Sequence, residues 1–99
     1  MIAVVSLVSP YAVDRALARS IHEEHDLVFI EVWVDTPLEE CERRDPKGLF
    51  ARARQGDLQG LTGVDDPYEA PQDPEFHVQP GTDDPVAPLI DALAGRGLL

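Results

Sequence analysis

The residues best suited to bind anions form one basic segment in the middle of the chain. Residues 43–54 contain Lys47, the only lysine, together with four of the seven arginines, and their net charge is +4. Guanidinium forks and an ammonium group are what phosphate and sulfate oxygens require. The segment therefore indicates an anion site. The alternative is a solvated helix whose cations balance neighbouring carboxylates.

Ser9 is the best candidate for a hydroxyl group that takes part in chemistry. It follows an apolar, mainly β-branched run at residues 2–8, which is typical of a strand buried on both faces of a parallel sheet. Open α/β sheets bind their ligands at the carboxyl ends of such strands. The Ser9 hydroxyl could there bind a ligand, donate a hydrogen bond or be phosphorylated. The alternative is a Ser-Pro turn that simply ends the strand.

A third segment, residues 60–71, is rich in glycine, proline and carboxylates. Loops of this length inside compact domains are usually functional or disordered. The chain has neither of the two glycine-rich phosphate-binding patterns, so it carries no phosphate loop of its own. Its three histidines share no metal-site spacing with Cys41, so no metal site is expected. Cys41 is expected to be a small packed residue on a helix.

Strands that alternate with helices must position these residues. The expected elements are a strand at 2–8, a helix at 13–22, a strand at 28–34, helices at 38–43 and 46–55, a strand at 75–78 and a helix at 86–94. Thr36 is expected to be the N-cap of the helix at 38–43, with Pro37 at its first helical position. Most of residues 56–88 is expected to be loop. This order predicts an α/β fold with parallel strands joined by right-handed crossovers.

Composition excludes several classes of protein. The 99 residues allow one small domain, and their net charge of −11 argues against binding to nucleic acid or to an anionic membrane. A single cysteine cannot form an intrachain disulfide, which favours a cytoplasmic location. No apolar stretch approaches the roughly 20 residues of a membrane span, and no signal peptide is recognisable.

Four segments of the chain resemble the carboxyl-terminal half of the adenylyl-sulfate kinases. They are residues 8–15 (VSPYAVDR), 29–42 (FIEVWVDTPLEECE), 44–49 (RDPKGL) and 60–71 (GLTGVDDPYEAP). Each segment is a weak signal alone, but the four occur in the family's order and are spread over residues 8–71 of the chain. The resemblance implies an α/β, P-loop kinase-like three-layer fold with a parallel sheet. It also implies that residues 1–99 are one part of a kinase domain, with a lid at about 43–56 and a substrate loop at about 57–74.

The resemblance also implies an activity. Members of this family transfer the γ-phosphoryl group of ATP, with Mg²⁺, to the 3′-hydroxyl of adenosine 5′-phosphosulfate in sulfate assimilation. By that likeness Val8 and Ser9 contact the adenylyl sulfate, and Ser9 falls where bacterial members have a phosphoserine intermediate, which direct in-line transfer would not need. Lys47 matches the lid lysine at the substrate. Arg44 matches the lid arginine near the ATP base, and Gly60 with Leu61 matches the pair at the substrate adenine.

Three departures from the family pattern limit these expectations. Leu61 stands where the family usually has Phe, and leucine cannot stack on adenine as an aromatic ring does. Ala12 replaces an arginine. The phosphate loop, the Mg²⁺ ligands and the strand that would lie between residues 2–7 and 28–34 are absent, so those two strands would expose unpaired edges or close together.

We therefore expect little turnover from this chain alone. A complementing phosphate-loop half or a homodimer would be its partner. The alternative is a non-catalytic nucleotide-binding or regulatory module derived from the kinase.

Overall fold

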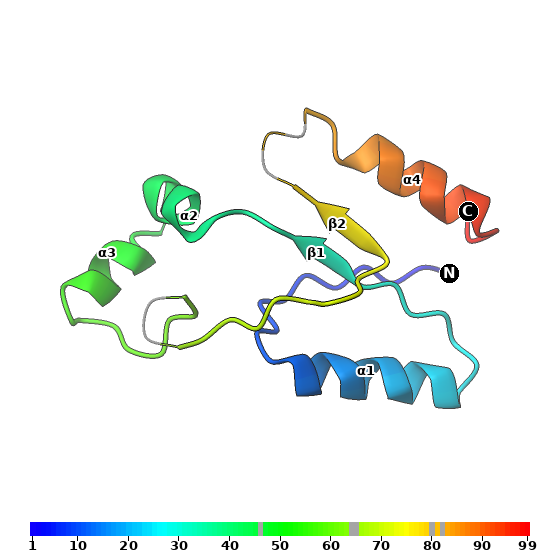
Figure 1. The fold of residues 1–99 in the computed structure, drawn as a ribbon, viewed down its shortest axis with the longest axis horizontal. Helices are drawn as coiled ribbons and strands as arrows, with labels where there is room; N and C mark the ends of the chain where they lie inside the picture. The colour runs from blue at the N-terminus through cyan, green and yellow to red at the C-terminus, as the bar shows by residue number, and fades with distance from the viewer. Residues whose placement is uncertain (46, 64–65, 80, 82) are drawn as a thin grey trace.

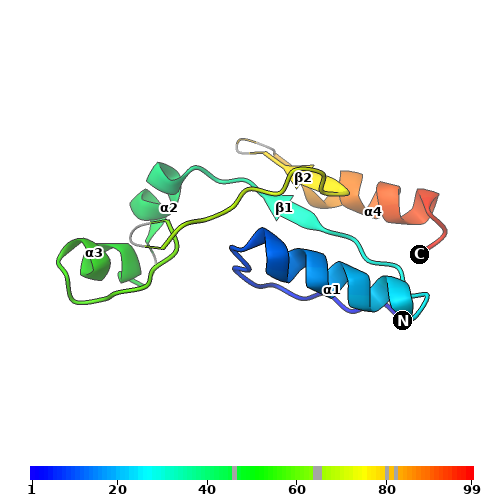
Figure 2. The ribbon, with the colours of Figure 1, turned by 60° about the horizontal axis from the view of Figure 1, so that its bottom comes forward.

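The computed structural model describes residues 1–45, 47–63, 66–79, 81 and 83–99. Their elements, in chain order, are α1 (Ala12–Glu24), β1 (Val32–Val34), α2 (Leu38–Arg44), α3 (Leu49–Arg54), β2 (Phe76–Val78) and α4 (Val86–Gly95). In Figures 1 and 2, α2 and α3 lie together at one end of the molecule, and both termini lie at the other end. Among the described residues, no helix is long and apolar enough to cross a membrane.

The sheet consists of β1 and β2 side by side and parallel (Figure 1). Val32, Trp33 and Val34 of β1 lie opposite Phe76, His77 and Val78 of β2, respectively. The expected strand at 75–78 is confirmed to within one residue. The expected strand at 28–34 is shorter than predicted, because its ladder can extend only as far as the three residues of its partner.

The prediction of a strand at residues 2–8 is wrong. Residues 1–8 form neither helix nor strand, and their apolar side chains are exposed, Val4 at 91% and Leu7 at 78%. A run of β-branched residues becomes a strand only when a neighbour accepts and donates its backbone hydrogen bonds. No described segment supplies that neighbour. Residues 2–8 and β1 therefore remain apart and do not close together as a pair.

One edge of β1 is open. The Phe76 amide donates to the Glu31 carbonyl (3.1 Å) and the Asp35 amide donates to the Val78 carbonyl (2.9 Å). In a parallel ladder, alternate residues point their amides and carbonyls to opposite edges, so those of Val32 and Val34 face away from β2. No described residue pairs with that edge. The sheet is thus incomplete on the side where residues 1–8 lie.

The helices of the structure agree with the sequence-based predictions more closely than the strands do. The expected helices at 13–22, 38–43 and 86–94 are confirmed within two residues of each end. Thr36 is not the cap of α2, because Pro37 occupies the N-cap position and Leu38 is the first helical residue. The helix expected at 46–55 begins at Leu49 in the structure, and its first expected residue, Pro46, lies outside the described residues.

The start of α3 has a local cause. Gly48 precedes it in the left-handed region (φ 67°), which glycine adopts without strain. The Asp45 carboxylate accepts hydrogen bonds from the amides of Phe50 (3.0 Å) and Ala51 (3.1 Å). Two of the amides that a helix start leaves without partners are thereby satisfied.

None of the described residues is buried. Even α1 meets the sheet through half-buried polar side chains: Arg15 pairs with Glu31 and Arg19 with Glu75. Its apolar positions Val13 and Leu17 are exposed. A chain of this size normally needs a buried core to offset the entropy of ordering. The elements are those of an α/β domain, but the core that would join them is missing from this part of it.

Candidate functional site

One open cavity of about 960 Å³ lies between residues 5–10 and β1. Val8 and Ser9 line it from the stretch that precedes α1, and Gly60 and Leu61 line it from the 57–74 loop. β1 and the start of α2 form another wall, which includes Trp33. The structure therefore brings together four of the six predicted site residues, although they come from segments about fifty positions apart in the chain.

Ser9 has a strained backbone. Its φ is +40°, a region that L-residues other than glycine rarely adopt. The Ser9 carbonyl accepts a hydrogen bond from Nη1 of Arg15 at 2.7 Å, which holds this conformation in place. Unfavourable backbone conformations persist only where surrounding contacts over-determine them, and they cluster at functional sites.

The 57–74 loop is tied to the turn that follows Ser9 by contacts at Glu69. The Glu69 amide donates to the Pro10 carbonyl (2.8 Å), and a Glu69 carboxylate oxygen accepts from the Ala12 amide at the start of α1 (2.8 Å). Arg15 Nη2 donates to the Glu69 carbonyl (2.5 Å). The guanidinium of Arg15 lies 5.9 Å from the centre of the Tyr68 ring, within cation–π range.

The same loop approaches α2 at Gly63. A Cβ atom placed on Gly63 would lie 2.9 Å from Leu38 Cδ1, and the φ of Gly63 is +88°. The Gly63 amide donates to the Asp66 carbonyl at 2.7 Å, and the Asp66 amide donates to the Leu61 carbonyl at 3.2 Å. Only glycine combines this conformation with this close approach. Gly63 thus sets how near the loop lies to the wall of the cavity.

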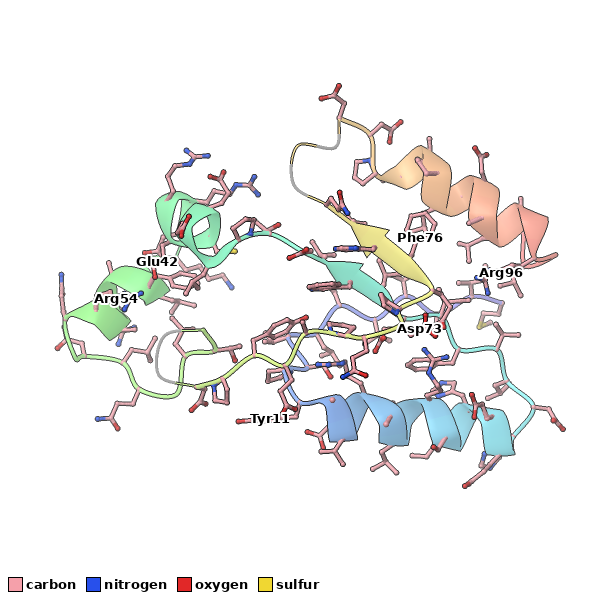
Figure 3. All side chains as sticks on the ribbon, in the orientation of Figure 1. Tyr11, Glu42, Arg54, Asp73, Phe76 and Arg96 are labelled. Carbon is pink, nitrogen blue, oxygen red and sulfur yellow. The ribbon has the colours of Figure 1, made fainter. Side chains whose placement is uncertain are left out.

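Lys47 and Arg44, the other two predicted site residues, do not line the cavity. Arg44 Nε pairs with Glu40 Oε1 at 2.9 Å, and Arg43 also binds that carboxylate. Arg54 of α3 pairs with Glu42 of α2 at 2.5 Å, and the two side chains are seen between these helices in Figure 3. Lys47 is exposed and makes no ion pair with a described residue. Much of the basic segment therefore balances carboxylates of α2, as the alternative interpretation anticipated.

These pairs shift pKa values. The Arg43 hydrogen bond, helped by Arg44, lowers the pKa of Glu40 to about 2. At the other end of the molecule, burial alone would raise the pKa of Glu75, but hydrogen bonds from Arg19 and from the Glu31 amide bring it below its ordinary value. Both carboxylates are therefore ionised at neutral pH and hold their arginines in place.

The sequence did not single out several residues that the structure places at the site. Arg15, Glu69 and Glu31 form the contacts around Ser9, and Trp33 stacks on His77 across the sheet. Residues 8–15 contain Arg15 and residues 60–71 contain Glu69, so the two motifs held the signal. Their pairing could not be predicted, because it depends on how a long loop returns to the sheet.

The described residues do not fit a Mg²⁺ site. Mg²⁺ prefers oxygen ligands in octahedral geometry and is held by carboxylates together with substrate phosphates. Among the described parts of the chain, no group of three or more His, Cys, Asp or Glu side chains is arranged to hold a metal ion. We therefore assign no Mg²⁺ ligand among the residues that the structure describes.

The chain resembles known proteins over most of its length. The family model "Adenylylsulphate kinase" matches residues 1–79. The adenylyl-sulfate kinase of Saccharomyces cerevisiae is 53% identical over 78 residues, which are 79% of this chain and 39% of that protein. The adenylyl-sulfate kinase of Penicillium chrysogenum is 46% identical over 107 aligned positions, which cover 99% of this chain and 51% of that protein.

A solved structure agrees with this match. The Mycobacterium tuberculosis APS kinase CysC, in complex with AMPPNP and APS, superposes with a TM-score of 0.85 and 46% identity over 89% of this chain and 52% of that one. This likeness establishes the P-loop kinase fold for the part of it present here. The chain spans about half the length of that structure and of the Penicillium relative, and less of the yeast one.

Proposed function

The chain belongs to the adenylyl-sulfate kinase family, and from this we propose that residues 1–99 provide the acceptor side of an adenylyl-sulfate kinase. The reaction is the ATP-dependent phosphorylation of the 3′-hydroxyl of adenosine 5′-phosphosulfate to 3′-phosphoadenylyl sulfate. The observation that carries the proposal is the cavity that Val8, Ser9, Gly60 and Leu61 line together.

The chemistry of these residues is suited to an acceptor nucleotide. Leu61 offers an apolar contact to a base, and the Ser9 hydroxyl can hydrogen-bond a ribose or phosphosulfate oxygen. Lys47, exposed and without an ion pair among the described residues, supplies a mobile positive charge for the anion. Arg44 would have to leave Glu40 to reach the ATP base. We propose residues 43–56 as the lid and residues 57–74 as the substrate loop.

In phosphoryl transfer the 3′ oxygen bonds to the γ-phosphorus while the bond from that phosphorus to the ADP oxygen breaks. Catalysis consists largely of positioning the groups and stabilising their charge. Ser9 could also form a phosphoserine before the phosphoryl group passes on. Residues 1–99 contain no loop to hold the β- and γ-phosphates, so ATP must be held by a further segment, from the same longer chain or from a partner.

The incomplete sheet supports the proposal that residues 1–99 bind the acceptor nucleotide and a further segment binds ATP. Val32 and Val34, at the open edge of β1, line the cavity, and so do the exposed Val5 and Leu7. We infer that a segment carrying a phosphate loop completes the sheet there. The isolated 99 residues are expected to transfer no phosphoryl group.

A coupled kinase assay tests the proposal. The 99-residue chain is mixed with ATP, Mg²⁺ and adenylyl sulfate, alone or with the amino-terminal half of a family member. We expect product only from the mixture, and none when that half lacks its phosphate loop. Activity from the 99 residues alone would contradict the proposal that a further segment must bind ATP.

Two variants refine the assay. Ser9→Ala is expected to lower the turnover of the mixture, whereas Ser20→Ala, at an exposed serine of α1, should leave it unchanged. Calorimetric binding of adenylyl sulfate without turnover in any mixture would favour the non-catalytic nucleotide-binding module instead.

A further inference from the structure

Arg15 joins three segments that are far apart in the sequence. Nη1 donates to the Ser9 carbonyl (2.7 Å), Nη2 donates to the Glu69 carbonyl (2.5 Å), and Nε lies 3.5 Å from a Glu31 carboxylate oxygen. The side chain is only 11% exposed, although none of the described residues is fully buried. Among the ion pairs of the described residues, it is the least exposed side chain.

The three contacts need a guanidinium. Its nitrogens lie in one plane and point in fixed, divergent directions, so one side chain can bind two carbonyls and a carboxylate at once. A lysine ammonium could keep the ion pair with Glu31 but could not span both carbonyls. The contact pattern therefore depends on arginine and not only on positive charge.

We propose that Arg15 is a positioning residue that fixes the separation between Ser9 and the substrate loop. Ser9 and Leu61 line one cavity from opposite segments, and a ligand held between them is bound well only at one separation. Arg15 borders the same cavity, but its guanidinium nitrogens already bind the two backbone carbonyls and the Glu31 carboxylate, so we assign its effect on the ligand to these contacts. This inference rests on the proposed function, because it concerns the same acceptor site.

The neighbouring contacts strengthen this role. Glu69 is also bonded to the turn before α1, through its amide to Pro10 and through its carboxylate to the Ala12 amide. Without Arg15 these two bonds alone hold the loop to the turn, and no other bond among the described residues fixes the Ser9 carbonyl, whose residue has an unfavourable positive φ. The expected result of losing Arg15 is a displaced Ser9 and a loop whose bond from the Glu69 amide to Pro10 opens more often.

Arg19 provides a matched control. It lies one turn further along α1 and pairs with Glu75 Oε1 at 2.7 Å. It also lies over the Phe29 ring. It bonds neither Ser9 nor the 57–74 loop through any contact in the described residues. A general requirement for cations on α1 would affect both arginines, whereas positioning of the loop affects Arg15 alone.

The first experiment is amide hydrogen exchange on the 99-residue chain. In Arg15→Lys, protection of the Glu69 amide is expected to fall about tenfold or more, as loss of a charge-assisted hydrogen bond implies. The Phe76 amide, which bonds to Glu31, should change little. Arg19→Lys should leave Glu69 protected. Equal protection of Glu69 in wild type and Arg15→Lys, or no protection of Glu69 in wild type, would overturn the proposal.

The second experiment measures kinetics on the chain mixed with the phosphate-loop half. Arg15→Lys is expected to raise the KM for adenylyl sulfate about tenfold, with the KM for ATP unchanged. Simple loss of folded protein would lower the apparent kcat and leave both KM values unchanged, which would count against positioning. If the wild-type mixture shows no turnover, the proposed function fails, while the exchange experiment still decides the role of Arg15.

Discussion

Trp33 of β1 and His77 of β2 stack face to face across the sheet, with ring centroids 4.2 Å apart and an angle of 5° between their planes. The Nε2 atom of His77 lies 2.9 Å from an Asp35 carboxylate oxygen, which fixes the imidazole from its far edge. Both rings come from residues directly opposite each other in the parallel ladder. The short sheet is therefore held by side chains as much as by its few backbone bonds.

This stack predicts a spectroscopic change. Trp33 is the only tryptophan, so its emission reports on this position alone. In His77→Ala one face of the indole ring meets water, and the emission maximum should move to longer wavelength. His25→Ala is the control, because His25 is exposed and bonds only within the end of α1. An unchanged emission maximum in His77→Ala would show that the stack does not form in solution.

Replacing Gly63 should lower the free energy of unfolding for two separable reasons. Gly63→Ala introduces a side chain at φ +88° and places its Cβ atom 2.9 Å from Leu38 Cδ1. Gly56→Ala introduces one at a similar φ of +83°, but there the new Cβ atom meets nothing within 4 Å. Both variants should lose about 1 kcal/mol or more of unfolding free energy from backbone strain.

Only Gly63→Ala should also lower the protection of the loop beside Leu61, because its Cβ atom meets Leu38. The double variant with Leu38→Ala removes this contact and should restore the protection of the loop. Urea unfolding followed by Trp33 emission measures the strain, and hydrogen exchange of the amide at position 63 measures the loop. Identical behaviour of the two glycine variants would mean that the contact with Leu38 has no effect.

Glu40 predicts a pH dependence at the basic segment. Its pKa is lowered to about 2 by the Arg43 hydrogen bond and by Arg44. A carboxyl whose folded pKa is depressed stabilises the fold above its unfolded pKa, and this contribution is lost as the pH falls toward 2. A carbon-detected NMR titration should show this midpoint. Arg43→Gln should raise it toward 4.5, the ordinary value, and Arg44→Gln should raise it less. A midpoint near 4.5 in the wild-type chain would contradict the pairing.

Replacing Leu61 by phenylalanine should increase the affinity for adenylyl sulfate. The family usually has phenylalanine here, and an aromatic ring stacked on adenine contributes about 0.5–1.5 kcal/mol beyond its buried area. Leu61→Phe should therefore lower the KM for adenylyl sulfate about threefold to tenfold in the mixture with the phosphate-loop half. Leu58→Phe, in the same loop but not in the cavity lining, is the control. An unchanged KM in Leu61→Phe would place the adenine elsewhere.

The sequence predicted those elements whose stability is local. The periodic apolar residues of α1 and the capping contacts of Asp45 at α3 act within a few positions of the chain, and both helices form close to where they were expected. Strand formation depends on a neighbour. Residues 2–8 have the composition of a central strand, but without a partner among the described residues they stay exposed and form no ladder.

The same distinction holds for the site. Ser9, Gly60 and Leu61 were singled out by motifs, and they do line one cavity. Arg15 was hidden within a motif, because nothing local shows that its two partners are the Ser9 and Glu69 carbonyls. Phe50 of the basic segment lines that cavity, but none of the segment's cations does. The roles predicted for these cations require a movement of residues 43–56 that a sequence cannot specify.

The open edge of β1 and the exposed residues 2–8 also bear on colloidal behaviour. Apolar segments and unpaired strand edges are templates for self-association into cross-β aggregates. Here the opposing force is mutual repulsion between molecules that each carry a net charge of −11. That repulsion vanishes near the isoelectric point, about pH 4.4. Mild acid or high salt should therefore precipitate the protein unless a bound partner already occupies the edge, so that the partner would also act as its solubilising chaperone.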